Sequence, residues 1–128
     1  MIDHVTISVT DLVKSKAFYE KAFIPFDYKV SFGENGKFWA FDIGNGTFFE
    51  IAQYKKTDRL TSCHFAFRAK SQEQVRQFYE AALAAGGKCN GTPGPRPPYA
   101  ESYYAAFVID PSGHNIEACF DPRTAVVS

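Results

Sequence analysis

The chain lacks the features that mark several classes of protein. Its cysteines are few, odd in number and nowhere spaced as CxxC; they are Cys63, Cys89 and Cys119. That pattern argues against a disulfide framework and against a zinc ribbon. No apolar run approaches the length that spans a bilayer, and the first residues lack the basic and then apolar pattern of a secretion signal. We therefore expect a cytoplasmic protein that contacts no membrane.

An excess of charge of one sign is also missing. The 14 basic and 14 acidic residues cancel, and neither sign forms a run, so the field that attracts nucleic-acid phosphates is absent. Apolar and aromatic residues are abundant instead, at 45% and 16% of the 128 residues. A chain of this size and composition is expected to fold as one domain, residues 1–128, with small molecules or another protein as partners.

The sequence repeats itself once, with a shift of sixty residues. Residues 4–23 read HVTISVTDLVKSKAFYEKAF, and residues 64–83 read HFAFRAKSQEQVRQFYEAAL. The shift places His4 on His64 and, without a gap, the FYE triplet of the first copy on that of the second. Self-similarity at a constant shift indicates a duplicated unit.

Both copies predict the same first elements. An alternating stretch opens each copy, at residues 5–9 and 65–68, with the period of a half-buried strand. A helix follows in each. Asp11 is positioned to cap the first helix, and Ser71 with Gln74 forms a capping-box pattern at the start of the second.

Further strands follow each helix, separated by turn residues. They are predicted near residues 28–32, 37–43 and 47–53 in the first copy, and near residues 88–90, 103–109 and 115–120 in the second. The Pro/Gly-rich stretch GTPGPRPPYAES, residues 91–102, is predicted to be a loop of the second copy only. The prediction is an α+β fold of two βαβββ modules, over about residues 1–57 and 61–121.

Strand alternation selects four side chains of the kinds that bind metals. Successive side chains of a strand point to opposite faces, so parity separates core residues from the rest. His4 and His64 begin the first strands of the modules, where the apolar residues take the other parity. In the last strands, Glu50 and Glu117 likewise take the parity opposite to that of the apolar residues. We predict that the duplication brings both pairs together in one divalent-metal site.

The types of these side chains limit the chemistry of such a site. Imidazole nitrogens and carboxylate oxygens suit Zn, Fe, Ni, Co or Mn, and the lack of thiolates disfavours a purely structural zinc. A metal there polarises a carbonyl group or lowers the pKa of bound water. Glu50 and Glu117 are also the candidates for proton transfer.

The whole chain resembles the vicinal-oxygen-chelate superfamily, which includes glyoxalase I, bleomycin-resistance proteins, fosfomycin-resistance enzymes and extradiol dioxygenases. The resemblance is carried by the opening MIDHVTISVTDLVKSKAFYEKAF, the second-half HFAFRAKSQEQVRQFYEAALAAGG and the closing YYAAFVIDPSGHNIEACF. The stretch GTPGPRPPYAESYY is similar to a glyoxalase-like bacterial branch. The resemblance implies paired modules that form a U-shaped mixed sheet around a metal-containing cleft, commonly in a homodimer.

The resemblance also assigns roles to the four residues. In the first module it places the first-strand ligand at His4 and the terminal carboxylate at Glu50. In the second module it places the histidine ligand at His64 and the last-strand glutamate at Glu117. Dioxygenase-like members use two histidines and one carboxylate, so a ligand at Glu50 favours glyoxalase-like lyases and isomerases.

Four more residues are candidates for contacts with a substrate. Arg68 and Arg96 are cations available to an anionic group. Tyr99 borders the Pro/Gly-rich loop, and Trp39 belongs to an aromatic group that could wall an apolar pocket or fill the core. His114 lies in a Pro-Ser-Gly-His turn and is expected to face solvent, outside the site.

Three functions are consistent with these features of the sequence. The first is a metal-dependent lyase or isomerase that chelates a small substrate through vicinal oxygens. The second is a metal-free protein that binds a small molecule such as a drug, of the bleomycin-resistance type. The third is an Fe(II) extradiol-type dioxygenase that uses His4, His64 and Glu117 without Glu50. The ligand types fit several ions, so they select neither the metal nor the substrate.

Overall fold

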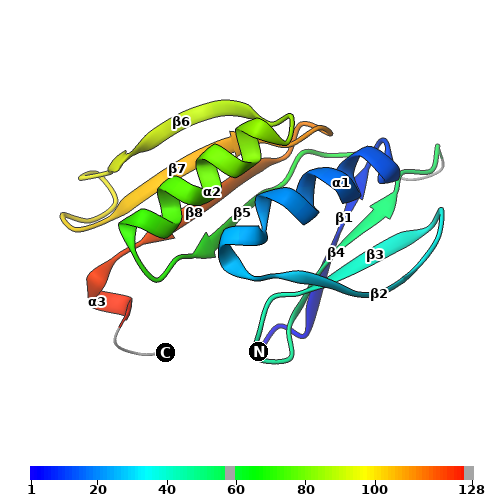
Figure 1. Ribbon diagram of the computed structural model, residues 1–128, viewed down its shortest axis with the longest axis horizontal. Helices are drawn as coiled ribbons and strands as arrows, with labels where there is room; N and C mark the ends of the chain where they lie inside the picture. Colours follow the sequence, from blue (N-terminus) through cyan, green and yellow to red (C-terminus); the bar gives the residue numbers. More distant parts are fainter. Residues whose placement is uncertain (57–59, 126–128) are drawn as a thin grey trace.

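The computed structural model describes residues 1–56 and 60–125. In chain order the elements are β1 (His4–Val9), α1 (Leu12–Ala22), η1 (Ile24–Phe26), β2 (Lys29–Glu34), β3 (Phe38–Asp42), β4 (Phe48–Gln53), β5 (His64–Arg68), α2 (Gln72–Ala84), β6 (Lys88–Pro95), β7 (Tyr104–Ile109), β8 (Asn115–Phe120) and α3 (Pro122–Ala125). The strands form two four-stranded mixed sheets, ordered β1-β4-β3-β2 and β5-β8-β7-β6 (Figure 1). This confirms the α+β fold of two βαβββ modules. The expected end of the first module, near residue 57, lies outside the described residues.

The helices begin where the capping residues predict. The Asp11 side chain accepts a hydrogen bond from the Lys14 backbone N–H at 3.1 Å, and Ser71 Oγ accepts one from the Gln74 N–H at 3.0 Å. Gln74 does not return the bond to Ser71 as in a complete capping box. Its amide accepts from the N–H of Lys70 and donates to the carbonyl of Pro25. The cap of α2 therefore also ties the second module to η1 of the first.

The two sheets place their glutamates at equivalent positions. In the first sheet β4 pairs in parallel with β1, and Glu50 lies opposite Thr6. In the second sheet β8 pairs in parallel with β5, and Glu117 lies opposite Ala66. In each sheet the module's histidine is two residues before the residue opposite the glutamate. The duplication seen in the sequence is therefore preserved in the strand pairing.

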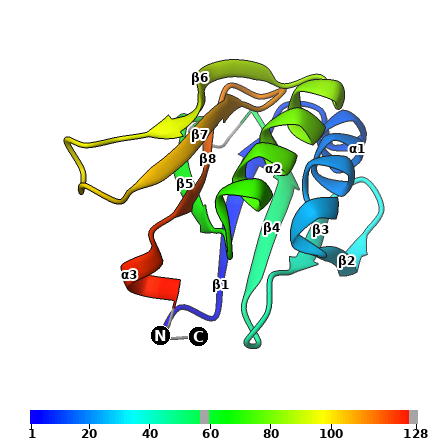
Figure 2. The same cartoon turned by 60° about the vertical axis from the view of Figure 1, so that its left-hand side comes forward.

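The modules share a single aromatic core. Helices α1 and α2 lie side by side over the same side of the two sheets (Figure 2). Phe23, at the end of α1, contacts Phe41 and Phe49 of the first sheet and Phe67 of the second, with ring centroids 5.2–5.8 Å apart. Because Phe23 packs on both sheets at once, each module completes the core of the other.

A buried histidine joins the modules at the turn before β8. His114 is 1% exposed, and its Nδ1 accepts a hydrogen bond from the Cys63 backbone N–H at 2.9 Å. The neutral ring therefore carries its hydrogen on Nε2, which donates to the carbonyl of Ser8 at 2.7 Å. The expectation that His114 faces solvent is wrong. The turn residues around it are polar, but its burial depends on β1 of the other module.

A second buried contact lies beside this histidine. Asp110 Oδ1 accepts from the backbone N–H groups of Ser112 and His114, and Oδ2 accepts from the hydroxyl of Tyr19 at 2.5 Å. Burial, followed by the charge of Asp110, raises the pKa of Tyr19 well above its ordinary value. Since Tyr19 belongs to α1, this bond also connects the two modules.

The Pro/Gly-rich stretch is not a loop along its whole length. Strand β6 continues through Gly91 to Pro95, with register shifts on both sides of Gly91. This strand is the edge of the second sheet, where prolines remove no necessary ladder bond and bulges are common. The predicted loop is therefore shorter than expected. No helix within residues 1–56 and 60–125 is long and apolar enough to span a membrane.

Candidate functional site

The four predicted ligands all lie on the faces of the sheets that point away from α1 and α2, which we call the open faces. Along β4 the residues on either side of Glu50 are fully buried in the core, while Glu50 itself is half-buried. His4 and His64 are exposed, and their strands bury the residues of opposite parity. The alternation predicted from the sequence is therefore observed in β1, β4 and β5, while in β8 Glu117 is itself buried between two core residues.

In the second module His64 and Glu117 are in direct contact. His64 Nε2 lies 3.0 Å from Glu117 Oε1, and Glu117 is only 4% exposed. The other carboxylate oxygen accepts a hydrogen bond from the hydroxyl of Tyr103 at 2.5 Å. Each oxygen of Glu117 therefore faces one of these two neighbours. We call His64 and Glu117 the second half-site.

The tautomer of a neutral His64 follows from the contact of its Nδ1 nitrogen. His64 Nδ1 lies 3.0 Å from the carbonyl of Asn115, and a carbonyl only accepts, so Nδ1 carries a hydrogen. A neutral His64 then presents the lone pair of Nε2 toward Glu117, and only a proton or another cation makes that contact favourable. A histidine that donates Nδ1–H to a backbone carbonyl and offers Nε2 is arranged as metal ligands commonly are. The second half-site therefore fits a divalent cation.

In the first module the corresponding residues make different contacts. Glu50 Oε1 accepts a hydrogen bond from Thr6 Oγ1 at 3.2 Å. His4 Nδ1 lies 2.8 Å from Asp3 Oδ1. The bond to Asp3, followed by the charge of Glu50, raises the pKa of His4. His4 and Glu50, which we call the first half-site, thus interact electrostatically without touching.

The two half-sites do not meet within one chain. Across residues 1–56 and 60–125 no three or more His, Cys, Asp or Glu side chains converge in a way that could hold a metal ion. The structure brings together His64 and Glu117, and it leaves His4 and Glu50 on the open face of the other sheet. A single chain presents two halves of the predicted site.

Arg96 is occupied by its own loop. Its guanidinium donates to the carbonyls of Gly94 and Thr92 at 2.9 and 2.7 Å, and lies 5.5 Å from the ring centroid of Phe107. The ring of Phe107 in turn stacks against His64, 6.1 Å away with 24° between the planes. Arg96 therefore stabilises the conformation of its own loop and packs near Phe107, the ring that contacts His64.

The remaining substrate candidates lie in three different surroundings. Tyr99 is 65% exposed and packs edge to face on Tyr103, at 5.3 Å between ring centroids. Arg68 is exposed on β5 opposite Cys119, on the open face of the second sheet. Trp39 lies on the helix side of the first sheet, where Lys16 Nζ is 4.1 Å from its ring. Trp39 is therefore on the face opposite to Glu50.

Two neighbours of the glutamates were not predicted from the sequence. Tyr103, the residue before β7, donates its hydroxyl to Glu117. Thr6, two residues after His4 in β1, donates its hydroxyl to Glu50. Tyr103 also contacts Cys119. Burial raises the pKa of the Cys119 thiol, and this effect is larger than the lowering caused by Tyr103 and Arg68. Cys119 is therefore a thiol at neutral pH. Strand parity alone could have nominated Thr6, but the contact of Tyr103 depends on the β7–β8 register.

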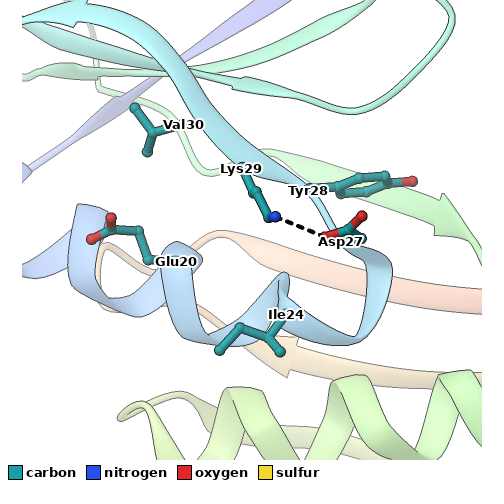
Figure 3. A pocket seen from close by; sticks show the side chains of 6 residues that line it. All are labelled: Glu20, Ile24, Asp27, Tyr28, Lys29 and Val30. Carbon is teal, nitrogen blue, oxygen red and sulfur yellow. Dashed lines mark ion pairs between the residues drawn. The ribbon is translucent and has the colours of Figure 1, made fainter.

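A hollow elsewhere on the surface contains none of the predicted residues. It lies at the end of α1, η1 and the start of β2, and is lined by Glu20, Ile24, Asp27, Tyr28, Lys29 and Val30 (Figure 3). Within it Lys29 Nζ and Asp27 Oδ1 are 3.4 Å apart, so these two charges neutralise each other. The hollow offers no set of side chains for metal or acid–base chemistry.

The profile of the Glyoxalase/Bleomycin resistance protein/Dioxygenase superfamily matches residues 1–118. A glyoxalase/bleomycin resistance protein from Albidiferax ferrireducens T118 is 27% identical, with a TM-score of 0.82 over 94% of this chain and 98% of that one. A glyoxalase-related enzyme from Fulvimarina pelagi is 21% identical, with a TM-score of 0.79 over 95% and 88% of the two chains. A lactoylglutathione lyase from Agrobacterium tumefaciens is 17% identical, with a TM-score of 0.72 over 94% and 92%. No curated protein matches the sequence significantly.

The duplicated βαβββ modules and their open-face His/Glu pairs define a class of small proteins built by doubling one unit. Within that class, the chain belongs to the Glyoxalase/Bleomycin resistance protein/Dioxygenase superfamily. The resemblance inferred from the sequence is therefore confirmed at the level of family and fold.

Proposed function

We propose that the protein is a metal-dependent enzyme of the lyase or isomerase type, acting on a small compound with vicinal oxygen atoms. The observation that carries the proposal is the contact of His64 Nε2 with Glu117 Oε1, with Nδ1 of the same ring anchored on the Asn115 carbonyl. The lactoylglutathione lyase from Agrobacterium tumefaciens, at 17% identity, shares the fold in which this site is built. Its substrate is not carried over to this chain.

The metal in this proposal is a divalent ion among Zn, Ni, Co, Fe and Mn, held by His4, Glu50, His64 and Glu117. When bound, such an ion supplies polarisation of the oxygens of the substrate. Glu117, buried and bonded to Tyr103, is suited to serve as a fixed ligand. Glu50 is half-buried and is bonded through Oε1 to the neutral hydroxyl of Thr6. Glu50 is therefore the better placed of the two carboxylates to accept and return a proton on the substrate.

We further propose that the site is completed in a homodimer. The half-sites lie on separate sheets of one chain, and no cluster of three potential ligands is formed among residues 1–56 and 60–125. In a two-fold dimer, contacts are reciprocal, so the first half-site of one copy can face the second half-site of its partner twice. This arrangement gives two equal sites from residues that a single chain keeps apart.

Elemental analysis of protein purified without a polyhistidine tag tests the metal. We expect about one divalent ion per chain, retained by Glu80→Gln, a matched change of an exposed carboxylate on α2. Glu117→Gln and Glu50→Gln should each lose metal. Failure to bind any divalent ion, even after reconstitution, would contradict the proposal.

Mixing two inactive variants tests the sharing of the site. His4→Ala and His64→Ala each remove one half-site from both sites of a homodimer. If the sites are shared between copies, refolding the two variants together restores one intact site per mixed dimer, and metal binding returns. If each site were formed within one chain, the mixture would bind no more metal than its separate components.

Two other functions are each favoured by one observation. A metal-free binding protein is favoured by the aromatic side chains on the open faces, such as Phe48 and Phe107; its ligand binding would survive chelator and His64→Ala. A dioxygenase that uses His4, His64 and Glu117 is favoured by the bond of Glu50 to Thr6. Oxygen consumption with catechols in the presence of Fe(II) would support it.

A further inference from the structure

A bulge in β2 turns one phenylalanine toward the first half-site. Val30 lies opposite Phe41, but the register then shifts, and Phe32 lies opposite Ala40. With regular pairing Phe32 would oppose Trp39 and point to the helix side. The shift places Phe32 on the open face, in the same cross-strand row as Ala40 and Glu50. Bulges re-aim side chains in this way and are frequent beside functional sites.

The residue after Phe32 makes this bulge possible. Gly33 lies opposite Trp39, and a Cβ atom on it would be 2.5 Å from both the carbonyl oxygen of Phe38 and Cε3 of Trp39. Any larger residue would collide with the backbone and the indole. Phe32 therefore presents its ring on the open face, and Gly33 leaves room for the indole of Trp39 on the helix side.

Phe32 is the centre of three aromatic rings on the open face. Its ring is edge-on to Phe48, at 5.2 Å and 71°, and to Phe38, at 6.0 Å and 76° between planes. We call Phe32, Phe38 and Phe48 the aromatic platform. Ala40 is fully buried although it faces the open side, and Phe32 remains 47% exposed. The platform thus covers Ala40, the residue opposite Glu50, and leaves the ring of Phe32 partly exposed.

The second module treats the equivalent row differently. Its β6 strand has a matching register shift, and Gly91 lies opposite Phe107, which in turn lies opposite Glu117. In the first sheet the edge strand supplies the large Phe32 and its neighbour the small Ala40. In the second sheet the edge strand supplies the small Gly91 and its neighbour the large Phe107. The planar guanidinium of Arg96 lies over Phe107 in the space that Gly91 leaves. In that module, the chain's own planar group is packed against the ring of the open face.

We propose that the aromatic platform binds a planar aryl group of the substrate, beside the vicinal oxygens that the metal site takes. This proposal rests on the proposed function and names its substrate class. The exposed part of Phe32 amounts to roughly 100 Å² of a phenylalanine surface. A stable protein interface buries about 800 Å² per partner. The uncovered area of Phe32 therefore matches the size of one aromatic ring. Because Phe38 and Phe48 contact Phe32 edge to face, a further ring can pack on Phe32 in a geometry that aromatic pairs favour.

The test compares mandelate with lactate, two 2-hydroxy acids that share vicinal oxygens and differ in a phenyl against a methyl group. Isothermal titration calorimetry of the metal-loaded protein should show mandelate binding about tenfold tighter than lactate. Phe32→Ala should remove that difference and leave lactate unchanged. Phe32→Leu, which keeps apolar volume, should retain part of it. Val13→Ala, an exposed apolar change on α1, should retain all of it.

The outcomes separate this proposal from the proposed function. Equal, metal-dependent binding of the two acids in the wild type would overturn the aryl site and leave the metal site intact. Binding of neither acid, or binding indifferent to chelator, would count against the metal-dependent function itself. If Phe32→Ala or Phe32→Leu converts a dimer to a monomer in sedimentation, the platform is an interface between copies, and the aryl proposal is overturned.

Discussion

The imidazole Nε2 of His114 donates a hydrogen bond to the carbonyl of Ser8 at 2.7 Å, which fastens the last turn of the second module to the first strand of the first. The same ring accepts the Cys63 N–H through Nδ1. Both nitrogens of a buried side chain are therefore used to hold backbone groups. A histidine employed in this way is a joint between modules, and its loss leaves two polar backbone groups unsatisfied.

We expect His114→Ala to lower the free energy of unfolding by about 2–4 kcal/mol, because buried unsatisfied donors and acceptors are costly and a cavity is added. Urea unfolding in the presence of chelator measures this. His4→Ala is the matched control: His4 is exposed and bonded to its neighbour Asp3, so its change should stay within about 0.5 kcal/mol. Equal effects of the two variants would show that His114 does not join the modules.

Tyr19 predicts a dependence of stability on alkaline pH. Burial raises its pKa in the folded chain, while the pKa of an unfolded tyrosine is about 10. The contribution of Tyr19 is therefore complete below about pH 10 and is lost as the pH rises further, because the unfolded chain releases the phenolic proton first. Above that pH, wild-type stability should fall more steeply than that of Tyr19→Phe, in urea unfolding at matched ionic strength.

At neutral pH the same variant should be less stable by about 1–3 kcal/mol, because Asp110 loses the hydroxyl that it accepts from. Tyr54→Phe is a control at a less buried tyrosine. Parallel pH profiles for wild type and Tyr19→Phe would rule out the role assigned to this hydroxyl.

Tyr103 predicts a loss of metal affinity without a loss of ligands. Its hydroxyl fixes one oxygen of Glu117 and leaves the other directed at His64. On the proposed function, Tyr103→Phe should weaken metal binding about tenfold, as expected when a partner that orients a ligand is removed. Competition with a metal-binding dye measures this. Tyr104→Phe, whose hydroxyl instead contacts Arg76, should bind metal as the wild type does.

Gly33 predicts a packing defect that reports on the bulge. Gly33→Ala should lower the free energy of unfolding by about 2 kcal/mol, because the added methyl group overlaps Trp39 and the backbone of Phe38. Gly36→Ala should cost about 1 kcal/mol through its positive φ alone, since open space surrounds it. Near-UV circular dichroism of Trp39, the only tryptophan, should change in Gly33→Ala and not in Gly36→Ala. An unchanged spectrum in both would contradict the account of the bulge.

Much of the fold could be predicted because its signals are local. The caps at Asp11 and Ser71 and the alternation in β1, β4, β5 and β8 depend on residues close together in the chain, and the shift of sixty residues is read by comparing its two halves. These signals were sufficient to predict two βαβββ modules and to place His4, Glu50, His64 and Glu117 on faces opposite to the core. Family membership followed from the same stretches.

Long-range pairing decided what those faces contain. Parity predicts the side of a sheet but not the partner across it, so the bonds of Glu117 to Tyr103 and of Glu50 to Thr6 became known only from the register. A bulge reverses parity beyond the point where it occurs, which is why Phe32 was not foreseen beside Glu50.

The sequence by itself determined the duplication, the elements and the chemical types of the candidate ligands. The duplication follows from comparing the two halves of the chain, the elements from local patterns, and the ligand types from the residues themselves. Only the tertiary structure decided that His114 is a buried joint, that Arg96 is used by its own loop and that the His/Glu pairs of one chain stay apart. Each of these depends on groups brought together from distant parts of the chain by a core that both modules share.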